Sequence, residues 1–130
     1  MAGTVTATYR KSASVRVVDV EWTSDASGDA TGTVFLDGQL IKVVTNPSAT
    51  APTDNYDITL VDEDSIDVAG GLLANRDTTN SEEVYLFKQV TLTGTGSDAA
   101  AVPIYHGGLV TFTVAAAGNA KSGVARIYLR

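Results

Sequence analysis

Residues 109–129 read LVTFTVAAAGNAKSGVARIYL, and this stretch decides the fold class. From residue 110 to residue 114 an apolar side chain alternates with threonine, which is the pattern of a strand with one buried face and one exposed face. A Gly-containing turn at residues 118–123 follows, and residues 124–129 alternate again. Alternating runs joined by such a turn are typical of a β-hairpin, so we predict that residues 109–114 pair with residues 124–129.

The same alternation recurs towards the N-terminus and predicts the core. We expect the buried residues to include the set Val20, Trp22, Ile58, Leu60 and Phe112. The last run leaves two choices open, because alternation alone does not say whether Ile127 or Tyr128 faces inwards. Tyr9, Phe35 and Phe87 also lie on or beside alternating runs, so core packing is the default expectation for them.

Residue usage and turn signals extend this interpretation to the whole chain. The chain has 16 Val and 17 Thr, which favour strands, and no stretch of convincing length has helical periodicity. Asp37-Gly38 lies between two apolar runs and predicts a type I′ hairpin turn. We therefore predict a single all-β domain over residues 1–130, a β-sandwich or jelly-roll-like barrel of about eight or nine short antiparallel strands. Residues 1–14 are a candidate N-terminal arm.

Composition excludes several classes of function. The chain of 130 residues has no Cys, a single His and a net charge of −6. Disulfides, Cys-based zinc sites and Cys nucleophiles are therefore excluded, as is a multi-His metal site within one chain. The acidic balance argues against general nucleic-acid binding. No apolar run reaches the ~18 residues of a membrane span, and no secretory signal is visible at the start. We expect a protein that is not an enzyme and needs no cofactor.

The acidic segment 54–67 is the densest functional-looking cluster. It holds Asp54, Asp57, Asp62, Glu63, Asp64 and Asp67. Carboxylates at this density can bind Ca²⁺, but the spacing from Asp62 fails the EF-hand pattern, which requires an oxygen ligand where Ile66 stands. A solvated hairpin whose outward positions are acidic is the favoured interpretation, and cation binding stays open as the alternative.

Two further motifs are weaker. His106 lies beside Gly107 and Gly108, which favours an exposed His in a turn, and no neighbouring nucleophile is apparent. Residues 118–123 contain Lys121-Ser122 but lack the glycines that a phosphate-binding loop requires. We interpret this segment as a simple turn between strands.

Charge is distributed unevenly along the chain. Residues 1–20 carry Arg10, Lys11 and Arg16 against one acid, and residues 99–130 carry three basic residues and no acid. The middle, residues 21–98, carries 14 acids against three basic residues. If the terminal strands lie together, one side of the molecule is positive and the other negative. We therefore predict that the basic ends dock on a partner, with Arg10, Lys11 and Arg16 as the candidate binding residues.

Five segments with turn residues and strand alternation stand out as a set: residues 56–64 (YDITLVDED), 67–71 (DVAGG), 74–78 (ANRDT), 108–114 (GLVTFTV) and 118–123 (GNAKSG). Together they resemble small structural proteins of tailed bacteriophages, in particular capsid decoration or cement proteins. The resemblance covers roughly residues 15–130 and rests on turns and strand alternation rather than on catalytic motifs. It implies a β-sandwich or jelly-roll-like protein, commonly trimeric, that binds the major capsid protein on the outside of the virion after assembly in the host cytoplasm.

Two alternatives remain open at this point. A tail, neck or head-completion protein of the same virion would share the strand content. A carbohydrate- or Ca²⁺-binding β module is an alternative from a different class, and it would present exposed aromatic side chains or clustered carboxylates.

Overall fold

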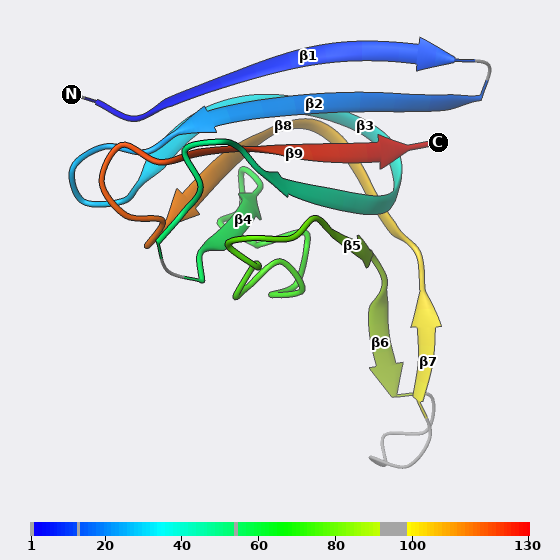
Figure 1. Ribbon diagram of the computed structural model, residues 1–130. Coiled ribbons are helices and arrows are strands. Elements are labelled where there is room, and N and C mark those ends of the chain that lie inside the picture. The colour runs from blue at the N-terminus through cyan, green and yellow to red at the C-terminus, as the bar shows by residue number, and fades with distance from the viewer. Residues whose placement is uncertain (1, 13, 54, 92–98) are drawn as a thin grey trace.

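The structure is a computed structural model that describes residues 2–12, 14–53, 55–91 and 99–130 (Figure 1). Those residues contain nine strands and no helix, so the predicted all-β class is confirmed. The strands are β1 (Thr4–Ser12), β2 (Val15–Thr23), β3 (Ala30–Pro47), β4 (Asp57–Val61), β5 (Glu82–Tyr85), β6 (Lys88–Thr91), β7 (Ala99–Val102), β8 (Ile104–Ala115) and β9 (Ser122–Leu129).

One large antiparallel sheet has the strand order β1-β2-β9-β3-β8-β4, with β5 added to β3. In Figure 1, β1, β2 and β9 lie above β4, while β3 and β8 curve around one side of the molecule. The arrangement is compatible with a β-sandwich, and the described strands do not close into a barrel. Residues 4–12, which belong to the segment considered as a candidate arm, form β1 and pair with β2 along its whole length.

β3 is long because the strand bends and continues, so that its two halves pair with different neighbours. Residues 30–40 pair with β8, whereas residues 40–47 pair with β9, and the register shifts between Leu40 and Lys42. Gly38 lies just before this shift with a φ of 117°, a conformation that side chains other than glycine rarely adopt. The predicted hairpin turn at Asp37-Gly38 is therefore wrong, because the glycine bends a continuous strand at this position.

The predicted C-terminal hairpin is also wrong, although both of its strands exist. β8 and β9 follow one another in the chain, but β3 lies between them in the sheet. The connection at residues 116–121 carries the chain from one part of β3 to the other. Alternation identified the strands correctly and could not identify their partners, because it reports which face is buried and nothing about the neighbouring strand.

The core between the curved halves of the sheet contains the residues expected from alternation. Val20, Trp22, Ile58, Leu60 and Phe112 are all at most 2% exposed. In the last strand Ile127 and Leu129 face the core, and Tyr128 is only half-buried, which settles the choice left open above. The rings of Trp22 and Tyr56 lie 5.2 Å apart between centroids, so β2 packs directly on the start of β4.

The remaining aromatic side chains do not follow the core expectation. Tyr9, Phe35 and Phe87 are 53%, 49% and 44% exposed, so the default expectation of core packing is wrong for them. Phe35 shows the reason. Its neighbours Val34 and Leu36 are buried, and successive residues of a strand point to opposite faces. The aromatic side chains outside the core are thus available for other roles.

Burial of Tyr56 predicts a distinctive behaviour at high pH. Burial raises the pKa of Tyr56 to about 12, because the phenolate is poorly solvated inside the protein. Since the unfolded chain ionises more easily, the free energy of unfolding should fall as pH rises from the normal pKa of 10 through this value. Ultraviolet difference absorbance should show one late-ionising tyrosine, and Tyr56→Phe should remove that step. If Tyr56→Phe instead removes an ionisation step near the normal tyrosine pKa of 10, the prediction is contradicted.

Candidate functional site

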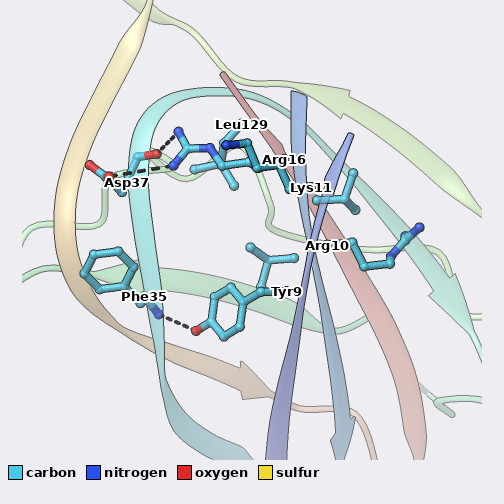
Figure 2. Close-up of a pocket in the computed structure, with 9 residues that line it drawn as sticks. Tyr9, Arg10, Lys11, Arg16, Phe35, Asp37 and Leu129 are labelled. Atoms are coloured by element: carbon cyan, nitrogen blue, oxygen red, sulfur yellow. Dashed lines mark hydrogen bonds and ion pairs between the residues drawn. The ribbon is translucent and has the colours of Figure 1, made fainter. Parts of the chain in front are cut away.

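A small hollow of about 150 Å³ separates the β1–β2 hairpin from the first half of β3 (Figure 2). It exists because β3 has turned away from β9, leaving backbone groups along this edge without a strand partner. Side chains of β1 and β2 take the place of that partner. The Phe35 N–H donates to the Tyr9 hydroxyl at 2.8 Å, and the Arg16 guanidinium donates to the Asp37 carbonyl. These contacts connect the two parts of the sheet.

The structure brings the three predicted docking residues to the rim of this hollow, where they have different surroundings. Arg10 donates to Asp19 at 2.9 Å, and Figure 2 shows its side chain directed away from Phe35. Arg16 is held by Asp37, whose carboxylate also lies 3.7 Å from the guanidinium. Lys11 is exposed and has no ion-pair partner among the described residues. Lys11 is therefore the one of the three whose charge is most available to a partner.

Asp19 stabilises three adjacent strands on the outer face of the sheet. Its carboxylate accepts hydrogen bonds from Arg10 on β1 at 2.9 Å and from Arg126 on β9 at 2.6 Å. Partial burial raises the pKa of Asp19, but the hydrogen bonds from Arg126 and Arg10 outweigh this effect, so the net pKa lies below its usual value. Arg10 thus has a structural partner that charge counting along the sequence could not identify.

The first and last strands of the chain lie in one sheet, which is the condition under which the charge distribution predicts a positive side. β2 pairs with both β1 and β9, which places the first and last strands in one sheet. Arg130 follows β9 and exchanges two backbone hydrogen bonds of 2.9 Å with Gln39 beside the hollow. We call Lys11, Arg16 and Arg130 the basic end. Lys121 directly precedes β9 and thus lies at the opposite end of that strand from Arg130.

An apolar patch adjoins the basic end and was missed by the sequence interpretation. Phe35 and Leu109 are direct cross-strand partners on β3 and β8 and are 49% and 61% exposed. Tyr9 reaches Phe35 from β1 and is also exposed. We call Tyr9, Phe35 and Leu109 the apolar patch. The alternation along β3 and β8 could have predicted this patch. Val34 and Val110 are buried, so their neighbours Phe35 and Leu109 must point to the opposite, exposed face.

Three carboxylates of the acidic segment accept backbone hydrogen bonds, and Asp57 does so from the Asn75 N–H at 2.8 Å. Asp62 accepts the N–H groups of Asp64 and Ile66, and Asp67 accepts those of Leu60, Ala69 and Gly71. Such contacts are typical of Asx turns, in which a carboxylate replaces a backbone acceptor. Asp54 lies outside the described residues. Within the described residues, no group of three or more His, Cys, Asp or Glu side chains is placed to hold a metal ion.

His106 lies within a strand rather than in an exposed turn. It belongs to β8, pairs with Gly38 and is half-buried, so the turn interpretation is wrong. The segment 118–123 does connect two strands as expected, and Ser24 holds it by donating to the Gly118 carbonyl at 2.5 Å. Both segments are therefore held in place by contacts within the fold.

The described ranges contain no helix that is long and apolar enough to span a membrane. Comparison of the chain with protein-family models, curated proteins and solved structures gave no match.

Proposed function

We propose that this chain is a non-enzymatic structural protein of a tailed-phage virion that binds the major capsid protein and stabilises the outside of the capsid. The proposal begins from the sequence resemblance described above. The observation that supports it most is the juxtaposition of the basic end with the apolar patch, since exposed apolar side chains beside a charged rim are typical of protein-binding surfaces.

The two parts of this surface should contribute differently to binding. Exposed ion pairs are worth only ~0–1 kcal/mol each, so the apolar patch must supply much of the affinity. The basic end should act mainly on the rate of association with an acidic capsid exterior. The net charge of −6 would keep decorated particles apart, because the rest of the surface is acidic.

Lys11→Glu tests the docking side most cleanly. Arg10 and Arg16 have intramolecular partners, so reversing their charge would disturb the fold as well as docking. We expect Lys11→Glu to bind undecorated capsids about 2–10-fold more slowly than wild type at low salt. The difference should shrink at 1 M salt, where the Debye length is about 3 Å. Stopped-flow light scattering of capsids mixed with purified protein measures both rates.

Lys121→Glu is the matched control, because it changes the net charge equally at the opposite end of β9. It should associate faster than Lys11→Glu at low salt. Equal rates for the two variants would show that only total charge matters and would remove the basic end from the docking surface. Absence of any binding by wild type would contradict the proposed function itself.

Carbohydrate binding is the second candidate, and the exposed aromatic side chains favour it. Tyr85 and Tyr105 are 55% and 70% exposed, in addition to Tyr9, Phe35 and Phe87. Flat exposed rings can stack on sugars. A thermal melt against a glycan panel separates the two candidates, since a ligand that binds only the native state raises its stability.

A further inference from the structure

The first half of β8 has an open edge. On one side β8 pairs with β3 from Ile104 to Val114, but on the other side β4 pairs only with residues 111–115 (Figure 1). Among the described strands, none pairs with residues 104–110 on the side of β4. An unpaired edge of this kind is a template for another strand, and folded proteins usually cover it or blunt it.

The backbone groups that face this edge can be identified from the contacts of β3. The Phe35 N–H donates to the Tyr9 hydroxyl at 2.8 Å, so Phe35 directs its backbone groups away from β8. In antiparallel pairing, two directly opposite residues either both face each other or both face away. Leu109 is opposite Phe35 and therefore directs its N–H and C=O groups to the open edge. Because strands have a period of two, Gly107 and Tyr105 do the same.

The side chains along the edge leave space for a strand and offer it apolar contacts. Tyr105 and Leu109 are 70% and 61% exposed. Gly107 lies between them on the same face and has no side chain, so a large apolar side chain of an added strand would pack over it. On the opposite face, a Cβ atom added at Gly108 would meet no atom within 4 Å.

A groove of about 370 Å³ lies along this edge, where β4 ends. Residues 106–111 line it, together with Asp62 and Glu63 from the turn that follows β4. Neither carboxylate has an ion-pair partner in the described part of the chain, and the described lining contains no Lys or Arg. The groove is therefore acidic beside the end of β4.

We infer that the open edge of β8 accepts an extended basic segment of a partner protein as an added strand. Main-chain hydrogen bonds to Tyr105, Gly107 and Leu109 would hold the segment in line with β4. Charge complementarity with Asp62 and Glu63 selects a segment whose basic residues lie at that end. An antiparallel segment in line with β4 begins there, so its basic residues come first.

The inference goes beyond the proposed function, because it concerns a second surface with the opposite charge preference. The basic end is expected to dock on an acidic capsid exterior, whereas the groove beside β4 is acidic. Strand addition at β8 can therefore succeed or fail independently of capsid binding.

Amide hydrogen exchange of the full chain, followed by NMR, tests the inference. The probe is the end-capped peptide Lys-Lys-Thr-Val-Phe-Val-Thr, which places its Phe opposite Gly107 when its lysines lie beside the acidic turn. In the protein alone, the amides of Tyr105, Gly107 and Leu109 should exchange fast, and those of His106 and Gly108, which face β3, slowly. Peptide at ten times its Kd should slow the first three about tenfold and leave the other two unchanged.

Two N-methylated peptides test whether the backbone makes the contact. N-methylation removes a main-chain donor and leaves the side chains as they are. In the inferred register both Thr residues and the Phe face the edge of β8, and both Val residues face away. Methylation of the Thr and Phe nitrogens should therefore abolish the protection of the three amides, and methylation of the Val nitrogens should preserve it.

Glu63→Lys tests the charge of the groove. We expect this variant to bind the basic peptide about 2–5-fold more weakly than wild type, the range for an exposed ion pair. Glu21→Lys is the matched control, because it makes the same change of charge at an exposed position on β2. It should bind the peptide like wild type.

Four results would overturn the inference. They are no protection at millimolar peptide, equal binding of the two N-methylated peptides, equal binding by Glu63→Lys and Glu21→Lys, and edge amides that are protected in concentrated protein alone and lose this protection on dilution. The last result would identify a second copy of the chain as the occupant. Capsid binding is measured separately, so loss of decoration with intact peptide binding would count against the proposed function alone.

Discussion

Phe112→Ala should destabilise the protein by about 3–5 kcal/mol, the cost of truncating a fully buried Phe. Phe112 is 0% exposed and lies in β8, where it faces Gly32 of β3 on one side and Leu60 of β4 on the other. Removing the ring leaves a cavity at the point where these three strands meet, and a close-packed core relaxes only partly around it. Urea unfolding followed by Trp22 fluorescence measures the loss.

Phe35→Ala is the matched control, since it removes the same ring from the exposed face of the neighbouring strand. We expect a loss below about 1 kcal/mol, as for most surface substitutions. A small effect of Phe112→Ala, or equal effects of the two variants, would contradict the assignment of faces to β3 and β8.

Gly38→Ala should cost about 2–4 kcal/mol, because the corner of β3 depends on this glycine. A side chain at a φ of 117° alone costs about 1–3 kcal/mol. A Cβ atom would also clash with the carbonyl oxygen of Arg130 and with the guanidinium of Arg16. The backbone oxygen cannot move without breaking the pairing of Arg130 with Gln39.

Gly107→Ala is the matched control for Gly38→Ala, because Gly107 lies beside Gly38 in the sheet. Gly107 pairs with Asp37, and an added Cβ would have only the Asp37 Oδ1 atom within 4 Å, at 3.9 Å. Thermal melts should show a clear decrease in midpoint for Gly38→Ala and little change for Gly107→Ala. Equal midpoints for both variants and wild type would show that β3 does not depend on the positive φ at its corner.

The sequence predicted which faces are buried far better than it predicted which strands pair. Alternation correctly placed Trp22, Ile58 and Phe112 in the core, because burial on one face of a strand imposes a period of two. It could not show that β3 lies between β8 and β9, since strand order depends on contacts distant in sequence. The signal at Asp37-Gly38 was real but ambiguous, because a glycine with positive φ serves a bend as well as a turn.

The candidate docking surface was predicted in part for a similar reason. The uneven distribution of charge along the sequence pointed to Arg10, Lys11 and Arg16 as candidate docking residues, and the structure brings them to the rim of one hollow. The carboxylates that hold Arg10 and Arg16 come from the strands β2 and β3, and the local sequence around each arginine does not indicate these partners. The apolar patch could have been predicted, since the alternation that buries Val34 also exposes Phe35.

The position of the protein on the virion tests the proposed function most directly. Wild-type protein carrying a gold label at its N-terminus would be added to undecorated phage particles and imaged by negative-stain electron microscopy. Capsid decoration predicts label distributed over the whole head, and the label should decrease when unlabelled protein competes. Label confined to one vertex or to the tail would contradict decoration and support the neck or tail alternative, and unlabelled particles would contradict both.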